Sequence, residues 1–471
     1  MKAGAGKVRI TPPVGIPILG HLFRVSEGVH DDLWAKVLLF EEGGEVGGLV
    51  ALDLAWPMPE GDYVKIRDAI QDATGIPGQN FMVSCTHCHS GPAFKPHPGF
   101  PIPLKRQREL IEPWVEELPH KVAKAAELAA SDMREVEVRF GRVPITGLTY
   151  NRRKRIPEGV ASLINVSAKE SRYYYGDASE IPESIRQQYV HWGMPRQMAE
   201  ELPPSIPDGP IDPDLTVICF DGVAILVNFA CHAVATAPPV PNLISAGFPG
   251  YMAELVEQAT GAVCLFTTGA SGDIRPYRSK PRGFEEVERI GLALAAGVMK
   301  AREGALPIED RKVKVASEFV EVPLREYPPK DEVSRILKEM EEEFERARSQ
   351  GRYKDAKRLL DRMNALDYPI RYFDWIDQRG TVRIELQAIW IGDVVLLSIP
   401  NEVNVGLGLE LKERAGTDKL VLVTLANGFY MYLLKREEYE EGGYEEAACR
   451  FAPGSGEMVV EAAVRLVGGR R

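Results

Sequence analysis

The sequence predicts an α/β fold in which mixed β-sheets are surrounded by helices. Three pairs of apolar runs, each pair joined by a short polar turn, predict β-hairpins at 36–54, 215–229 and 382–399. Amphipathic segments between and after these hairpins predict helices. The 471 residues are 45% hydrophobic and 27% charged, which is the composition of a globular chain that can bury a large core.

The first third of the chain alternates between predicted strands and helices. The first hairpin turns at Glu41–Gly44, and a helix is expected over Pro57–Thr74. An Ala-rich amphipathic stretch predicts a second helix at 110–132, and the alternation of Val136–Phe140 predicts a strand. This order of elements is typical of the α/β class.

The middle of the chain is less regular. Residues 147–213 hold many Pro, Tyr and Arg residues, and we expect an ordered functional excursion there because long structureless loops are rare. It opens with the basic cluster Tyr150–Arg155, for which a solvated turn is an equal interpretation. Asp221–Gly222 and Gly392–Asp393 are the turns of the two later hairpins. Val263–Pro276 predicts a strand that runs into a loop of small residues, where backbone amides can approach a substrate.

Two helical segments follow. Lys330–Asp367 is densely charged, carries apolar residues at helical spacing and breaks at Gln350–Gly351, which predicts a charged helical hairpin over about 330–367. We expect it to be a solvated arm rather than a lid or a dimer contact. An Ala- and Val-rich stretch, Gly456–Val467, predicts the last helix.

The segment Phe81–Pro92 organises the chemistry of the chain, because an apolar run ends there in two histidines. If the strand continues, Cys85, His87 and His89 share one face. One interpretation is a metal site, since neutral imidazole is the commonest zinc ligand. A second is covalent haem attachment, because Cys85–His89 matches C-x-x-C-H. The third is a buried strand whose histidines only make hydrogen bonds.

Composition narrows these interpretations. The net charge of −11 and the pI of about 5.5 argue against nucleic acid or an anionic membrane surface as the main partner. The N-terminus lacks the apolar segment of a signal peptide, and no apolar run is long enough to span a bilayer, so a cytoplasmic location without membrane insertion is expected. Six cysteines in so long a chain are no disulfide framework, and covalent haem attachment normally requires export.

Two further side chains that can bind a metal come directly after a predicted strand, as the histidines of Phe81–Pro92 do. His232 comes directly after the second strand of the 215–229 hairpin, and Glu402 comes directly after that of the 382–399 hairpin. Two imidazoles and a carboxylate form a known catalytic zinc shell that leaves one position for water. The chain therefore repeats one way of presenting ligands.

Eight segments, in the same order along the chain, resemble the neutral ceramidase family. They are Ile10–Pro13, Val29–Asp32, Thr86–Pro92, Asn151–Arg152, Asn228–His232, Gly269–Pro276, Pro400–Glu402 and Asn427–Tyr444. The resemblance implies a zinc-dependent amide hydrolase, and it implies that His87, His232, Glu402 and Tyr432 bind one catalytic Zn²⁺. It also implies that nearly the whole chain, residues 1–471, is one catalytic domain, because ligands spread from residue 87 to residue 432 must converge.

The resemblance also implies roles around the metal. His89 is similar to the family residue that contacts the scissile group, and it would relay a proton or stabilise an oxyanion. Tyr444 is similar to the other active-site tyrosine of the family, and Arg152 to an arginine near the substrate. Thiolate binding by Cys85, Cys88 or Cys231, which flank the ligands, is a minor alternative.

The departures from the family concern the substrate. Arg275 stands where ceramidases carry a serine near the reacting amide, and Ala233 replaces a common proline. The chain ends soon after Tyr444, so the C-terminal β-sandwich domain of full-length ceramidases is expected to be missing. A guanidinium binds carboxylate or phosphate in bidentate fashion, so Arg275, with Asp273 beside it, predicts a soluble, anionic small-molecule substrate. An equal alternative is that Arg275 pairs with Asp273.

The sequence thus predicts a zinc-dependent amidohydrolase with no nucleic-acid partner. A zinc-dependent ester or phosphoester hydrolase on the same ligands is the first alternative. A catalytically inactive binding protein on the same fold is the second. Sequence leaves the oligomeric state open, with a homo-oligomer as one option.

Overall fold

The computed structural model describes most of the chain. The described residues are 1–18, 24–55, 62–92, 105–156, 159–162, 209–234, 242–277, 284–352 and 377–469, with isolated positions between 355 and 370. Most of the predicted excursion at 147–213, much of the second half of the charged arm and Pro57 at the expected start of the first helix lie outside these residues.

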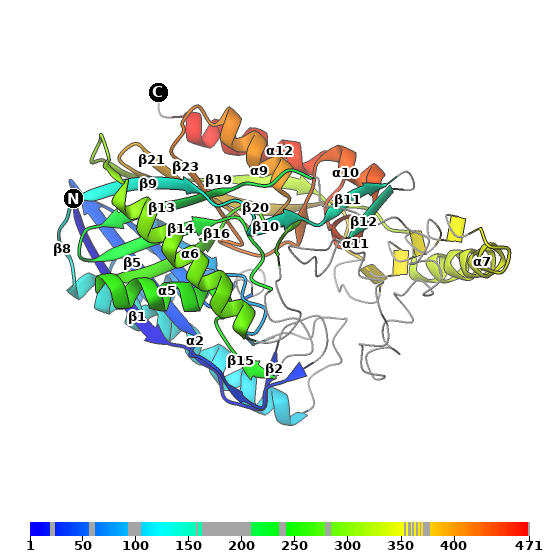
Figure 1. The fold of residues 1–471 in the computed structure, drawn as a ribbon, viewed down its shortest axis with the longest axis horizontal. Helices are drawn as coiled ribbons and strands as arrows, with labels where there is room; N and C mark the ends of the chain where they lie inside the picture. Colours follow the sequence, from blue (N-terminus) through cyan, green and yellow to red (C-terminus); the bar gives the residue numbers. More distant parts are fainter. Residues whose placement is uncertain are drawn as a thin grey trace.

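Three larger sheets form the body of the protein (Figure 1). Sheet 1 has the order β7-β6-β5-β1-β8, sheet 2 the order β16-β14-β13-β9-β18, and sheet 3 the order β19-β20-β21-β23. The strands of sheet 1 are β1 (Lys2–Arg9), β5 (Trp34–Glu42), β6 (Glu45–Leu52), β7 (Phe81–Cys85) and β8 (Arg134–Glu135). Those of sheet 2 are β9 (Val138–Pro144), β13 (Asp214–Phe220), β14 (Ala224–Phe229), β16 (Val263–Thr268) and β18 (Leu306–Pro307). Those of sheet 3 are β19 (Val313–Pro323), β20 (Thr381–Ile391), β21 (Val394–Ile399) and β23 (Leu420–Thr424).

The three sheets share one topology. In each, three successive strands pair antiparallel, and a fourth strand then pairs parallel with the third: β1, β5, β6 and β7 in sheet 1, β9, β13, β14 and β16 in sheet 2, and β19, β20, β21 and β23 in sheet 3. A parallel connection needs a crossover, and a helix supplies it each time: α1 (Asp62–Thr74), α5 (Gly247–Thr260) and α9 (Val405–Arg414). The carboxyl ends of the third and fourth strands of each sheet therefore lie at one edge.

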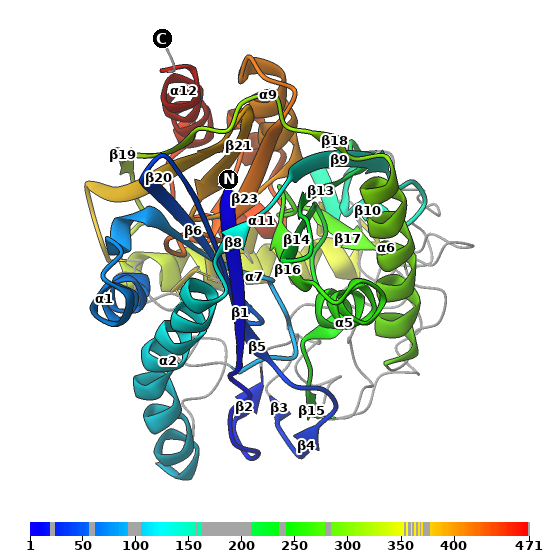
Figure 2. The same cartoon turned by 90° about the vertical axis from the view of Figure 1, so that its left-hand side faces the viewer.

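Helices cover the outer faces of the sheets, and Figure 2 shows them on three sides of the molecule. Sheet 1 is covered by α1 and by α2 (Lys105–Ser131), sheet 2 by α5 and by α6 (Glu285–Glu303), and sheet 3 by α9 and by α12 (Ser455–Gly468). The inner faces of all three sheets meet in a central core that includes Phe40, Phe220 and Ile389. Because both faces of these strands are buried, the strands are nearly continuous apolar runs in the sequence.

Smaller elements surround this body. Two-stranded ladders pair β2 (Pro17–Ile18) with β3 (Arg24–Val25), β4 (Gly28–Val29) with β15 (Leu243–Ile244), β10 (Thr149–Asn151) with β17 (Ile274–Pro276), β11 (Arg153–Ile156) with β12 (Gly159–Ser162), and β22 (Glu402–Val403) with β24 (Tyr432–Leu433). The remaining described helices are η1 (Gly78–Asn80), α7 (Lys330–Ser349), α10 (Arg436–Glu441) and α11 (Tyr444–Ala447). Helix α7 is the first half of the charged arm, and it projects from the body in Figure 1.

The predicted α/β class, the three hairpins and the helices at 110–132 and 456–467 are confirmed, with α2 beginning five residues earlier. Helix α7 ends at Ser349, and Gly351 has a φ of 70°, so the predicted break in the arm is confirmed. The strand predicted over Val136–Phe140 is confirmed from Val138 onward, as β9, whereas Val136 and Glu137 lie outside it. The chain crosses there from β8 in sheet 1 to β9 in sheet 2, because the amide of Val136 bonds to the carbonyl of Met1 at the edge of sheet 1.

Among the described residues, no helix combines the length and the apolar character that crossing a bilayer would require.

A buried ion pair connects α1 to sheet 3. Arg67 donates to Glu385 of β20 at 2.8 Å, and both side chains are less than 10% exposed. The same guanidinium also donates to the carbonyl of Phe81, at the start of β7. Arg67 therefore joins a crossover helix of sheet 1 to the neighbouring sheet.

Replacing one partner of this pair is expected to destabilise the fold. Arg67→Met leaves the Glu385 charge buried without its cation, so the free energy of unfolding should fall by about 3–5 kcal/mol in urea titrations. The double variant Arg67→Met/Glu385→Leu should recover most of this loss. As a control, Arg335→Met breaks an exposed pair with Glu339 and should cost less than about 1 kcal/mol. Equal small losses for both single variants would contradict the prediction.

Candidate metal centre

The candidate centre lies where strand ends of all three sheets meet. His87 comes two residues after β7 of sheet 1, His232 three residues after β14 of sheet 2, and Glu402 three residues after β21 of sheet 3. Hydrogen bonds join these ends, since Thr268 donates to the carbonyl of Thr86 and Thr424 to that of Thr268. The three side chains are therefore brought together by the packing of the sheets.

His87 lies in a tight turn rather than in a strand. Strand β7 ends at Cys85, and His87 has a φ of 60°, a left-handed conformation that costs a non-glycine residue about 1–2 kcal/mol. The prediction that His87 and His89 face one site is confirmed, but its reason, strand alternation, is wrong. The turn directs the ring so that Nδ1 lies 2.7 Å from the carbonyl oxygen of Ala55.

His232 is held in the same manner. Its Nδ1 lies 2.5 Å from the carbonyl oxygen of Ser271, and its backbone amide donates to the carbonyl of Ile274. Burial, with a further contribution from nearby His87, lowers the pKa of His232 to about 3. The imidazole is therefore neutral at physiological pH, which is the form that binds metal ions.

The two carbonyl contacts fix the tautomers of both rings. A carbonyl oxygen only accepts hydrogen bonds, so Nδ1 carries the proton in each imidazole and Nε2 presents a lone pair. These Nε2 atoms lie 3.5 Å (His87) and 3.1 Å (His232) from Oε2 of Glu402. Glu402 is buried, and its Oε2 has no hydrogen-bond donor among the described residues.

Three acceptors thus converge without a proton between them. With both ring protons on Nδ1, the Oε2 atom of Glu402 and the two Nε2 lone pairs face one another without a donor, and a bound cation would remove their mutual repulsion. A carboxylate and two imidazole lone pairs in a buried site fit a divalent cation, and this donor set is typical of catalytic zinc. The residues present therefore fit the metal that the sequence predicts.

His89 lies beside this set. Its Nε2 is 3.3 Å from Nε2 of His87, and grouping the described residues by ligand distances alone joins His87, His89 and His232 within 4.8 Å. We favour Glu402 over His89 as the third ligand, because Glu402 is buried and its Oε2 has no donor among the described residues, whereas His89 is partly exposed. His89 is then available for proton transfer.

The thiols of two cysteines near the centre donate hydrogen bonds to backbone carbonyls. Cys88 donates to the carbonyl of Ser245, Cys231 to that of His232, and burial raises the pKa of both thiols above its usual range. No cysteine belongs to the metal-competent group found in the described part of the chain. Cys85 and Cys88 are also fully buried, which leaves no access for covalent haem attachment.

Tyr432 is the direct neighbour of Glu402. The two residues are register partners in the parallel ladder of β22 and β24, so their side chains share a face. Tyr432 is buried, and burial together with the Glu402 charge raises the pKa of its phenol well above the usual value. Arg152 donates to its oxygen at 3.1 Å.

Tyr444 and Arg152 border the same region. The ring of Tyr444 meets that of Tyr432 edge-on at 5.7 Å, and the guanidinium of Arg152 lies 5.2 Å from the centre of the Tyr444 ring. Tyr444 is 36% exposed, in contrast to the buried Tyr432 and Arg152. The fold thus places Tyr444 between the buried ligand group and the surface.

The two residues expected to bind substrate differ in their surroundings. Asp273 accepts hydrogen bonds from Asn151 (2.7 Å) and from the backbone amide of Val405 (2.8 Å), so both of its oxygens hold the loop in place. Arg275 is buried on β17, paired across the ladder with Tyr150, and burial lowers its pKa. An Arg275–Asp273 pair, the alternative from sequence, is not among the ion pairs of the described residues.

Sequence reasoning missed three parts of the centre. The carbonyls of Ala55 and Ser271 fix the histidines, and a backbone carbonyl has no signature in the sequence. Glu445, fully buried, binds both Arg152 and Arg153. Burial alone would raise the pKa of Glu445, but the two arginines hold it below the usual value. In the sequence, the one indication of a role for Glu445 is its position directly after Tyr444.

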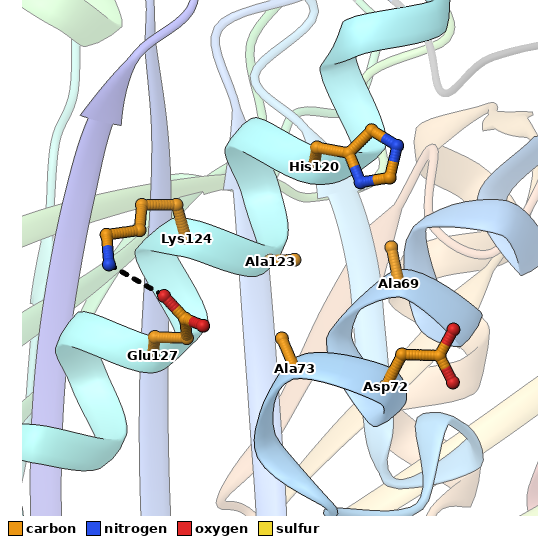
Figure 3. A pocket seen from close by; sticks show the side chains of 7 residues that line it. All are labelled: Ala69, Asp72, Ala73, His120, Ala123, Lys124 and Glu127. Carbon is orange, nitrogen blue, oxygen red and sulfur yellow. Dashed lines mark hydrogen bonds and ion pairs between the residues drawn. The ribbon is translucent and has the colours of Figure 1, made fainter.

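A separate surface hollow of about 340 Å³ lies between α1 and α2 (Figure 3). Its walls are Ala69, Ala73 and Ala123 together with the charged or polar side chains Asp72, His120, Lys124 and Glu127. Lys124 and Glu127 pair with each other at 2.7 Å. It contains none of the residues of the candidate centre, and His120 serves below as a control histidine.

Comparison with known proteins gives structural neighbours only. No protein-family model and no curated protein sequence matches the chain. The fold is similar to that of the neutral ceramidase from Pseudomonas aeruginosa, with a TM-score of 0.69, 18% identity, and coverage of 99% of this chain and 74% of that one. It is also similar to a ceramidase solved in complex with C2, with a TM-score of 0.67, 15% identity and the same coverage. At these identities the similarity establishes the ceramidase-like fold.

The centre is expected to bind one metal ion per chain. After dialysis against zinc, elemental analysis should give about one ion per wild-type chain and a small fraction of that for His232→Ala, because one of the convergent donors is lost. His120→Ala removes a histidine from the α1–α2 hollow and should keep the wild-type content. Wild-type protein without metal after reconstitution, or equal content in both variants, would contradict the assignment.

Proposed function

We propose that this chain is a zinc-dependent hydrolase that cleaves an amide bond of an N-acyl compound, with residues 1–471 acting as one catalytic unit. The observation that carries the proposal is the convergence of His87 Nε2, His232 Nε2 and the Glu402 carboxylate without a donor among the described residues. The ceramidase-like fold supports the choice of an amide bond, since the two structural neighbours described above are ceramidases.

In this proposal His87, His232, Glu402 and Tyr432 hold the ion. When bound, Zn²⁺ supplies Lewis acidity and lowers the pKa of water toward neutrality. The two backbone carbonyls at Ala55 and Ser271 orient the imidazoles, in the way that outer hydrogen bonds orient metal-binding histidines.

The remaining residues of the centre act on protons and charge. His89 accepts a proton from the water that attacks the carbonyl carbon, and it delivers this proton to the nitrogen when the C–N bond breaks. Tyr444 and Arg152 are hydrogen-bond donors for the negative charge that develops on the carbonyl oxygen. The products are a carboxylic acid and an amine.

For the substrate we propose a small anionic molecule. Arg275 and Arg152 are both buried near Tyr432 and Tyr444, so two guanidinium groups border the region where an acyl compound would lie. Asp273 contributes indirectly, by holding the loop that carries Arg275. A cytoplasmic location and the oligomeric state stay predictions from the sequence.

Hydrolysis should depend on the metal and on Glu402. With N-acyl amino acids as probes, removing zinc with a chelator should abolish release of the acid, and added zinc should restore it. Glu402→Gln should lower kcat/KM at least about 100-fold. Esters and phosphoesters belong in the same panel. Cleavage of only these would favour the ester or phosphoester hydrolase, and zinc binding without any cleavage would favour the inactive binding protein.

Arg275 should set the preference for anionic substrates. The measurement is the ratio of kcat/KM for N-acetylglycine to that for its methyl ester, because a ratio does not depend on the folded fraction. Arg275→Ala should lower this ratio about 10- to 100-fold, the value of a lost charge-assisted hydrogen bond. Arg139→Ala, which breaks a pair with Asp221 in the turn of sheet 2, is the control and should leave it unchanged. An unchanged ratio in Arg275→Ala refutes the anionic substrate.

A further inference from the structure

Glu445 is a fully buried acid that follows Tyr444 in α11. Its Oε1 accepts from Nε of Arg152 at 2.5 Å, and its Oε2 accepts from Nη1 of Arg153 at 2.9 Å. We infer that Glu445 is a positioning residue, which holds the guanidinium of Arg152 against the phenol oxygen of Tyr432. The inference rests on the proposed function, in which Tyr432 binds the metal and Arg152 donates to the reacting oxygen.

The position of the Arg152 head matters because three groups of the centre contact it. Its Nη2 donates to Tyr432 Oη at 3.1 Å and to the carbonyl of Gly272 at 2.8 Å. The guanidinium also lies over the ring of Tyr444. A rotation of this head would therefore change the surroundings of a proposed ligand and of a proposed donor together.

Glu445 supplies the charged restraint on this rotation, in addition to the carbonyl of Gly272 that accepts from Nη2. The backbone of Arg152 is fixed by its amide, which donates to the carbonyl of Asp273, but this contact leaves the side chain free to turn. Among the ion pairs of the described residues, Glu445 is the acid that pairs with Arg152, and it bonds to Nε, the atom nearest the pivot of the head. The orientation of the Glu445 carboxylate therefore determines the orientation of the Arg152 guanidinium.

Arg153 holds Glu445 from the other side. This second arginine donates to the carbonyl of Gly442 at 3.0 Å and to Glu441 at 3.3 Å, both at the end of α10. The contacts thus run from α10 through Arg153 and Glu445 to Arg152 and Tyr432. Charge-assisted bonds at both carboxylate oxygens make this arrangement directional.

The neighbouring residue provides a matched control. Glu446 lies on the same short helix and is also buried, but its carboxylate pairs with Arg325 instead of Arg152. Glu445→Gln and Glu446→Gln therefore make the same chemical change at adjacent buried acids. A merely structural role would affect both variants alike, whereas positioning of Arg152 would be confined to Glu445.

The test compares zinc affinity and kinetics of the two variants. Zinc affinity is measured by competition with a chromophoric chelator, and hydrolysis with the N-acyl amino acids above. In Glu445→Gln the affinity should fall about 10- to 100-fold, as for other residues that support metal ligands, and kcat should fall at least about tenfold with KM changed less than about threefold. Glu446→Gln should match the wild type in both, even if the two variants melt at equally lowered temperatures.

An Arg152→Met background then tests whether Glu445 acts through Arg152. There, Glu445→Gln should cause no further loss of zinc affinity or kcat. Equal zinc affinity and kcat in Glu445→Gln and Glu446→Gln, or a full additional loss in the Arg152→Met background, would overturn the inference.

Crystal structures of the metal-free variants separate this inference from the proposed function. If the wild type binds no zinc and cleaves no substrate, the proposed function fails, but the distance from Arg152 Nη2 to Tyr432 Oη still decides the positioning role. In Glu445→Gln this contact should be lost, and in Glu446→Gln it should be kept. A contact retained in both structures would overturn the role of Glu445.

Discussion

Two hydrogen bonds from imidazole Nδ1 atoms to backbone carbonyls are the interactions on which the candidate centre depends. Ala55 and Ser271 accept them, and they leave the Nε2 lone pairs of His87 and His232 facing the Glu402 carboxylate. Without these bonds either ring could take the other tautomer and donate a proton to Glu402, which would satisfy the carboxylate without any metal. The carbonyls thus arrange ordinary polar side chains as a set of acceptors that fits a cation.

The three-sheet arrangement explains why these carbonyls are available. Ala55, His232 and Glu402 occupy corresponding positions, each three residues after the third strand of its sheet. In sheets 2 and 3 this position carries a proposed ligand, whereas in sheet 1 it supplies the carbonyl for His87, which follows the fourth strand instead. A fold that brings six strand ends to one place offers both side chains and free carbonyls, because the strands' hydrogen-bond ladders stop there.

A second layer of charge surrounds the ligands. Arg152, Arg153 and Glu445 are buried together, and such groups seldom add much net stability, because desolvation costs about as much as pairing returns. Their benefit is directional, since each charge-assisted bond fixes the plane of a guanidinium or a carboxylate. The strained backbone of His87 is a second example. Its left-handed conformation costs stability, but it directs the imidazole toward the candidate centre.

The sequence by itself determined the α/β class, the hairpins and the identity of the side chains His87, His89, His232 and Glu402, because alternation, turn residues and chemical type are local properties. Only the tertiary structure decided which atoms face one another. The left-handed turn at His87 moved both histidines out of strand alternation, and the boundary between two sheets divided Val136–Phe140. The hydrogen bonds from the histidines to backbone carbonyls, and the ion pair between Arg152 and Glu445, join segments that lie up to 293 positions apart in the sequence. Every residue carries a carbonyl, and several acidic residues lie close to Glu445 in the sequence. Composition and spacing therefore cannot predict which of these groups becomes the partner.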